Sequence, residues 1–148
     1  MTDLEIQEIE SKKRYLKRYR KNRALINRLK LKIANLDDRI KSIRSPGFSD
    51  MPRGGTPITK EDLTAEKVDL ESRIKRLEAK GENIKNEILD IIDEIEDPRY
   101  AEVLESFLID CKDFGDIAED NDYSVRHIER LYGEAIKAIV GIMSVNCR

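Results

Sequence analysis

Few side chains in this 148-residue sequence have the types and spacing that catalysis requires. His127 is the only histidine, so a serine-type nucleophile would have a single possible base, and no nucleophile turn lies near it. Cys111 and Cys147 lack the CxxC spacing of a zinc site and could form at most one disulfide. We therefore expect free thiols, no metal, no cofactor and no enzymatic activity.

Basic residues near the N-terminus have the density that phosphate binding requires. Residues 1–43 hold 13 Lys and Arg against 6 Asp and Glu, whereas residues 90–148 hold 6 against 15. Such a tract favours contact with nucleic acid, although a solvated helix face or pairing with the acidic C-terminal segment would also account for it. The candidate phosphate contacts are Lys12, Lys13, Arg14, Lys17, Arg18 and Lys21.

Apolar residues at alternating spacings of three and four predict two long helices that carry this tract. One series runs from Ile26 to Ile43 and the other from Leu63 to Ile95, on either side of a Pro/Gly loop at 44–59. We expect an antiparallel coiled-coil hairpin over residues 1–96, although two chains could instead pair through the same seams. If the hairpin folds about residue 53, Ile26 meets Gly81.

The overall composition agrees with an all-α fold. Charged residues make up 39% of the chain and aromatic residues only 5%, which is typical of helices with narrow apolar stripes and argues against an all-β domain. The longest apolar run, 138–143, is far shorter than the ~20 residues that span a bilayer. We also expect Leu4, Ile6 and Ile9 to extend the first helix and to be buried against the C-terminal part.

Residues 97–148 have the pattern of a small helix-turn-helix domain. Asp97 followed by Pro98 predicts the start of one helix, Asp113 can cap a second short helix, and Ser124 can cap a third. Between the last two, Asn121 and Asp122 are residue types that tolerate a left-handed turn. Two short helices joined by such a turn are typical of DNA-binding helix-turn-helix motifs.

This segment resembles region 4 of bacterial sigma factors. The resemblance rests on the stretches Asp97-Pro98-Arg99-Tyr100-Ala101-Glu102-Val103-Leu104, Asp116-Ile117-Ala118-Glu119 and Tyr123-Ser124-Val125-Arg126-His127-Ile128-Glu129-Arg130-Leu131. With the basic hairpin and the Met51-Pro52-Arg53-Gly54-Gly55 loop, the whole layout is similar to phage late-gene transcriptional regulators of the RinA/ArpU type.

The resemblance implies a sequence-specific DNA-binding regulator, expected to activate late phage genes in the cytoplasm of a bacterial host. The third helix would enter the major groove of double-stranded DNA, with RNA polymerase and a second copy of the chain as further partners. In the carried-over roles, Ile117, Ala118, Ile128 and Leu131 hold the helices together. The residues that would face DNA are Ser124, Val125, Arg126, His127 and Arg130.

The acidic character of the tail keeps other functions open. Asp113, Asp116, Glu119, Asp120 and Asp122 surround the helix that would cross the phosphate backbone, and the turn lacks the family's usual glycine. A protein-interaction module or antirepressor without DNA binding is therefore one alternative. A terminase small subunit, which also joins a helix-turn-helix to oligomerising helices, is another.

Overall fold

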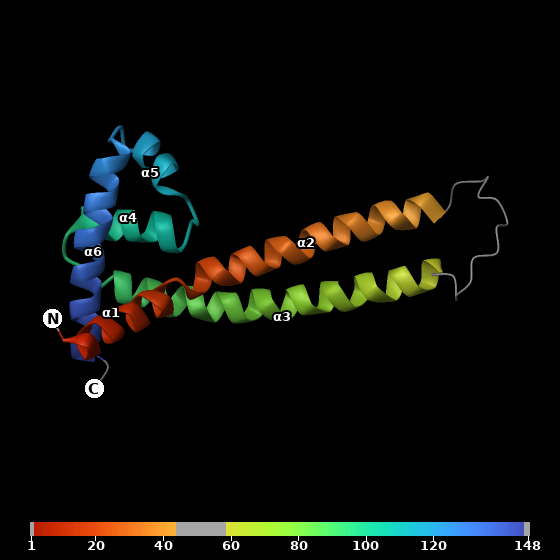
Figure 1. Ribbon diagram of the computed structural model, residues 1–148, viewed down its shortest axis with the longest axis horizontal. Helices are drawn as coiled ribbons and strands as arrows, with labels where there is room; N and C mark the ends of the chain where they lie inside the picture. The colour runs from red at the N-terminus through yellow and green to blue at the C-terminus, as the bar shows by residue number, and fades with distance from the viewer. Residues whose placement is uncertain (1, 44–58, 147–148) are drawn as a thin grey trace. The chain divides into compact units, whose positions relative to one another are not determined.

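The computed structural model describes residues 2–43 and 59–146, and these form six helices and no strand (Figure 1). The predicted all-α class is confirmed. The loop predicted at 44–59, with the Met51–Gly55 motif, lies outside the described residues except for Thr59. The helices are α1 (Asp3–Leu16), α2 (Arg18–Ile43), α3 (Lys60–Ile92), α4 (Pro98–Leu108), α5 (Phe114–Asp120) and α6 (Val125–Asn146).

Side-chain caps define the starts of these helices. Thr2 and Glu5 form a capping box at α1, and Thr59 and Asp62 exchange the same pair of bonds at α3. Asp97 accepts a bond from the Arg99 backbone N–H at the start of α4, with Pro98 at its first position as predicted. The first predicted helix is interrupted at Lys17, which leaves helical geometry (φ −83°, ψ 2°) and so separates α1 from α2.

The chain divides into two compact units. Unit 1 comprises residues 1–23 and 81–148, and unit 2 comprises residues 24–80. The expected division at 96/97 differs from this one because the ends of the hairpin helices share a core with the C-terminal helices. That core contains Leu16, Ile84, Ile88, Ile92, Leu104, Leu108, Ile109, Ala135, Ile136, Ile139 and Met143.

Unit 2 is a two-helix seam between parts of α2 and α3. Ile26 and Leu29 of α2 are buried against Ile74 of α3, and Ile33, Leu70 and Leu77 pack around them. The predicted alternation of spacings is therefore confirmed as the buried stripe, except at Ile43, which is 45% exposed. These contacts lie within one chain, as the antiparallel hairpin requires.

The predicted register of the hairpin is wrong by about one helical turn. In unit 1, Gly81 faces Asn22, whose side-chain amide occupies the space that a Cβ at position 81 would enter. The sequence prediction instead placed Ile26 opposite Gly81. The reason is steric, since only glycine leaves room for the buried Asn22 side chain.

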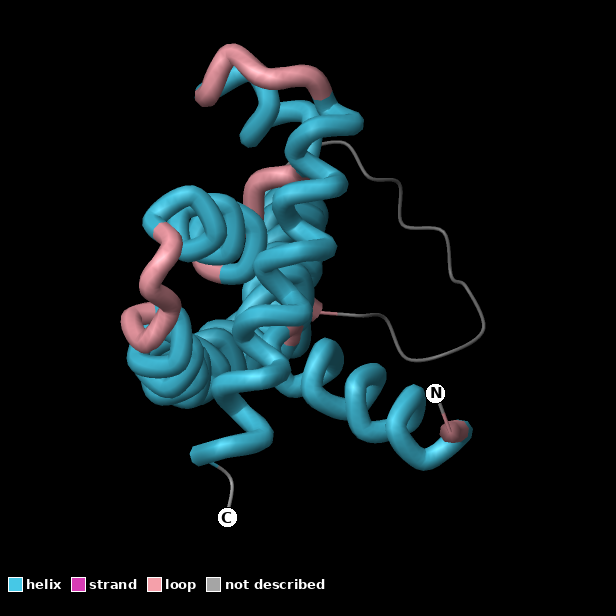
Figure 2. The backbone as a smooth tube through the Cα atoms, turned by 90° about the vertical axis from the view of Figure 1, so that its left-hand side faces the viewer, coloured by secondary structure: helices cyan, strands magenta, loops and turns pink. Residues whose placement is uncertain are grey.

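The N-terminal apolar residues are only partly buried, which corrects a further expectation. α1 lies beside α6, as Figures 1 and 2 both show, but Leu4 is 78% exposed and Ile6 46% exposed. Ile9 and the fully buried Leu16 are seven residues apart and share one face. At about 100° per residue, Leu4 points roughly 140° away from Ile9, so a helix that buries Leu16 exposes Leu4.

Candidate nucleic-acid interface

The turn between α5 and α6 fixes the geometry of the candidate site in unit 1. Asp122 has a left-handed backbone (φ 56°), as its residue type predicted. The Tyr123 N–H donates to the Ala118 carbonyl at 2.9 Å and the Asp122 N–H donates to the Glu119 carbonyl at 3.4 Å. These two bonds are those of a Schellman motif, which ends α5 abruptly and redirects the chain into α6.

A small apolar cluster holds α5 against α6. Ile117, Ala118, Ile128 and Leu131 are all at most 3% exposed, and Val103 of α4 completes the cluster. The four residues expected to join the two helices therefore do so. In Figure 2, α6 runs vertically and the loop before it lies at its upper end.

The residues predicted to face DNA lie on the solvent side at the start of α6. The Ser124 Oγ accepts a bond from the His127 backbone N–H at 3.1 Å, which confirms Ser124 as the cap. Val125 is 45% exposed although it is apolar, and Arg126 is exposed. Together with His127 and Arg130, Ser124 and Arg126 line a shallow hollow on this face.

Polar and aromatic contacts order part of this face. Arg130 Nη2 lies 2.8 Å from His127 Nδ1, and the Tyr123 ring meets the His127 ring edge-on at 4.7 Å. Because a guanidinium can only donate, this contact requires an unprotonated Nδ1 on His127. Tyr123 was not among the predicted site residues. Its position directly before the capping residue Ser124 could have identified it as a neighbour of this face.

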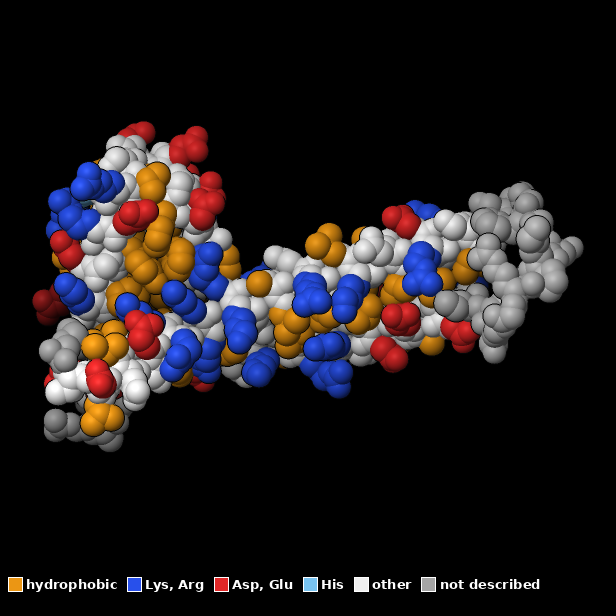
Figure 3. Space-filling model, in the orientation of Figure 1, with side chains coloured by type: hydrophobic (Ala, Val, Ile, Leu, Met, Phe, Trp, Pro, Cys, Tyr) orange, Lys and Arg blue, Asp and Glu red, His pale blue; other side chains and the backbone are white. Residues whose placement is uncertain are grey.

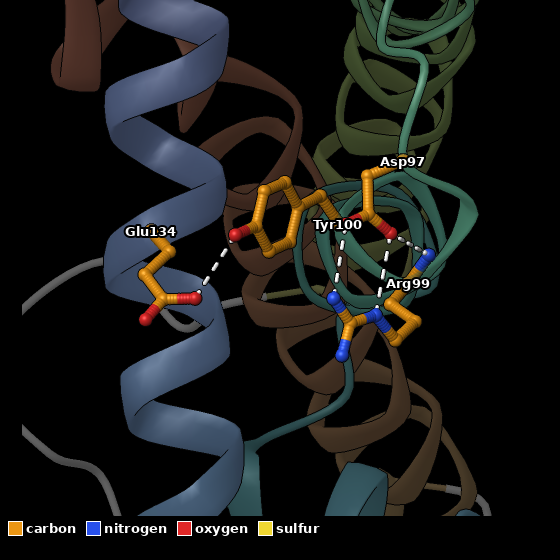
Figure 4. Close-up of polar contacts among 4 residues, drawn as sticks. All are labelled: Asp97, Arg99, Tyr100 and Glu134. Carbon is orange, nitrogen blue, oxygen red and sulfur yellow. Dashed lines mark hydrogen bonds and ion pairs between the residues drawn. The ribbon is translucent and has the colours of Figure 1, made fainter.

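A second set of contacts ties α4 to α6 beside this face (Figure 4). The Tyr100 hydroxyl donates to Glu134 Oε2 at 3.0 Å, and this bond with the carboxylate raises the pKa of Tyr100. Arg99 bonds to Asp97, whose pKa it lowers. Glu134 is therefore engaged by Tyr100. Within the described residues Arg126 and Arg130 form no ion pair with a carboxylate.

The acidic residues of the motif are exposed around α5. Asp116, Glu119 and Asp122 face solvent, and Asp113 caps the helix by accepting a bond from the Asp116 N–H at 2.8 Å. Among the residues that the structure describes, Asp120 is the one acid of this group that pairs with a base, Lys112, at 2.8 Å. The cluster opposes close approach of α5 to phosphate, whereas α6 exposes two arginines.

The predicted phosphate contacts fall into two groups. Lys12 lies 2.8 Å from Glu8 and also contacts Ser144, and Lys13 lies 3.5 Å from Glu10. Arg18 pairs with Glu87 at 2.7 Å, and its guanidinium lies 3.9 Å from the centre of the Tyr15 ring. The other three are exposed and form no ion pair within the described residues: Arg14, Lys17 and Lys21.

Arg20, in the same basic tract, has a structural role that spacing did not reveal. Its Nη1 donates to the carbonyls of Phe107 at 2.6 Å and Lys112 at 3.1 Å, and its guanidinium stacks on the Phe107 ring. These bonds close the loop after α4, in which Cys111 has a positive φ of 58°. No sequence pattern could have revealed this role, because both acceptors are backbone groups about 90 residues away.

Other kinds of site have little support. Within residues 2–43 and 59–146, no group of three or more His, Cys, Asp or Glu side chains is arranged to hold a metal ion. None of the described helices is both long and apolar enough to cross a bilayer. A scan against protein-family models found no match to this chain, and searches of curated proteins and of solved structures found none either.

Proposed function

We propose that this chain is a sequence-specific DNA-binding transcription regulator in which α6 reads bases in the major groove. The observation that carries the proposal is the division of α6 into two faces. Ile128 and Leu131 are buried against α5, while Arg126 and Arg130 project from the other side beside an exposed Val125. Arginine bonds to guanine edges, and an apolar side chain such as valine can contact a thymine methyl group.

The resemblance to late-gene regulators supports a more specific role. In that role the protein activates phage genes, and Arg14, Lys17 and Lys21 contact phosphates flanking the site that α6 reads. All three are exposed and have no ion pair among the described residues, so no local salt bridge has to break when they meet DNA. RNA polymerase is the natural second partner of a sigma-region-4-like domain.

The exposed acids of α5 favour a second candidate, a protein-interaction module that does not bind DNA. In a helix-turn-helix the first helix crosses the DNA backbone, and Asp116, Glu119 and Asp122 would repel phosphates there. A basic surface on a partner protein would instead be attracted by them. The two candidates predict opposite results in a binding assay.

The test begins with selection of binding sites from a random duplex library, using the full-length protein. We expect enrichment of one sequence. The Arg126→Ala variant should then bind that sequence about 10- to 100-fold more weakly, equivalent to ~1–3 kcal/mol, and lose preference at one or two positions. Its thermal stability should match the wild type, because Arg126 is exposed.

Lys137→Ala is the matched control for this experiment. Lys137 is exposed on the same helix, so the variant loses the same charge, but it lies 11 residues further along, roughly 16 Å down the axis. It should keep the wild-type sequence preference. A library that shows no enriched sequence would overturn base reading, and capture of a protein partner without DNA binding would favour the interaction module.

A further inference from the structure

The two flanks of the unit 2 hairpin carry different charge patterns. On one flank, Lys67 of α3 lies 2.7 Å from Asp37 of α2, a contact that raises the pKa of Lys67, and 3.9 Å from Glu71. On the same flank Lys30 lies 3.9 Å from Glu78. Each of these lysines therefore meets a carboxylate across the seam.

The middle of the opposite flank is basic on both helices, whereas Glu66 and Asp69 of α3 lie further along the same flank. The basic residues are exposed, and none of them forms an ion pair within the described part of the chain. We call this middle part the basic flank, and it consists of Arg28, Lys32, Arg73, Arg76 and Lys80.

Helical geometry places these five side chains together. In the heptad frame set by the buried Ile26, Leu29 and Ile74, Lys32, Arg73 and Lys80 occupy the g position beside the seam, and Arg28 and Arg76 the neighbouring c position. Lys30 and Glu78 occupy the e position on the other side. Figure 3 shows blue side chains on both helices midway along the hairpin, with seam hydrophobics between them.

This arrangement does not serve stability. In an antiparallel pair the g positions of the two helices face each other, and opposite charges there would stabilise the hairpin. Lys32 and Arg73 instead place like charges on the same side of the seam. The carboxylates of Asp37 and Glu78 lie on the other flank. A polyanion bound across both helices would relieve the repulsion between the like charges.

The chemistry of the basic flank fits the phosphate backbone of nucleic acid. Three of its residues are arginines, whose planar guanidinium bonds phosphate oxygens in pairs. Arg73 to Lys80 extend about 10 Å along the helix axis, and duplex DNA carries about six phosphates in that length. Five cations over this distance therefore approach the charge density of the duplex.

We infer that the basic flank of unit 2 is a second DNA-contact surface, which holds the phosphate backbone of duplex DNA without reading its sequence. The choice of DNA as the polyanion rests on the proposed function. None of the basic-flank residues belongs to α6. Arg28 and Lys32 belong to the basic tract of residues 1–43, whereas the three residues on α3 lie outside it. Summing charge along α3 conceals this surface, because acids such as Glu66 and Asp69 occupy the same g and c positions in other turns of the helix.

The test compares two full-length variants that lose the same charge. Arg73→Gln with Arg76→Gln alters the basic flank. Lys30→Gln with Lys67→Gln alters the other flank, where lysines pair with carboxylates, which we call the paired flank. Affinity for a 30-base-pair duplex is measured by fluorescence anisotropy between 50 and 200 mM salt, on the preferred sequence and on a scrambled one. Thermal melts establish that both variants fold.

The basic-flank variant should lose about 1.8 from the slope of log K against log salt, since each phosphate contact contributes about 0.9. Raising the salt from 50 to 200 mM weakens binding by some factor, and for the variant that factor should be roughly 12 times smaller than for the wild type. The loss should be equal on both sequences, and adding Arg28→Gln, Lys32→Gln and Lys80→Gln should bring it to about 4.5. The paired-flank variant should keep the wild-type slope.

Two outcomes separate this inference from the proposed function. Wild-type binding with equal affinity for both sequences, and a slope that falls only in the basic-flank variant, would support the surface while removing base reading. Sequence-specific binding with the same slope in both variants would overturn the surface and leave base reading intact. Binding to anionic lipid vesicles but to no duplex would overturn both.

Discussion

Unit 1 and unit 2 bury their apolar residues in different ways. Unit 1 packs buried side chains from α1, α3, α4, α5 and α6 into two clusters. An aromatic group joins the clusters, with ring centres 4.8–5.1 Å apart, and consists of Phe107, Phe114 and Tyr132. Unit 2 has a single seam in which Ile26, Leu29 and Ile74 are buried. A seam of this kind leaves two long flanks in solvent.

The contrast shows what a charged side chain can do in each unit. In unit 1 a basic residue can be drawn inward by backbone acceptors, as Arg20 is. In unit 2 a basic residue either pairs across the seam or remains in solvent, where it is available to a partner. The same residue type is therefore structural in one unit and a candidate contact in the other.

Replacing Arg20 by alanine is expected to give the largest effect among the variants that test this contrast. Two bonds from a charged donor to backbone carbonyls are lost, so the free energy of unfolding should fall by about 2–3 kcal/mol in urea denaturation. Arg28→Ala, on the same helix, should change it by less than about 0.5 kcal/mol. Arg20→Lys should not restore stability, because an ammonium lacks the planar fork. Equal urea midpoints for the Arg20→Ala and Arg28→Ala variants would contradict this difference between the two units.

The sequence predicted those features that depend on short spacings. The caps at Asp97, Asp113 and Ser124 each need only a side chain near the first turn, and all are present. The seam stripes need only the alternation of three and four. The residues exposed at the start of α6 were named by the resemblance to sigma region 4 and not by spacing.

Features that depend on partners distant in sequence were not predicted. The register requires knowing that Asn22 fits over Gly81, and the inward turn of Arg20 requires knowing where the chain places two carbonyls. The exposure of Leu4 follows only once Leu16 is known to be buried. Function is a further step again, since base reading by α6 and phosphate contact by unit 2 stay predictions.

Gly81→Ala tests the register and should have an intermediate effect. A Cβ would collide with the Asn22 amide, so we expect a loss of about 1–2 kcal/mol of unfolding free energy despite the better helix propensity of alanine. In an Asn22→Ala background the collision is absent, and the same substitution should be neutral or stabilising by up to ~1 kcal/mol. A double-mutant cycle by chemical denaturation measures the coupling between the two positions. Additive effects would show that the residues do not face each other.

The smallest effect at neutral pH is expected for Tyr132→Phe, which tests the aromatic group of unit 1. The Tyr132 hydroxyl is buried without a hydrogen-bond partner among the described residues, and burial raises its pKa to about 12. Removing an unsatisfied hydroxyl should leave stability within about 1 kcal/mol of wild type, or raise it.

The pH dependence makes this prediction sharp. Above pH 10 the unfolded chain releases the phenol proton while folded Tyr132 retains it, so wild-type stability should fall from about pH 10 to 12. Tyr132→Phe should lose that part of the decline, whereas Tyr123→Phe, at an exposed tyrosine, should retain it. Urea midpoints measured at pH 8, 10 and 11 decide the matter. If the decline is the same in Tyr132→Phe as in wild type, the hydroxyl is reached by water, and the aromatic group of unit 1 is as open to solvent as the flanks of unit 2.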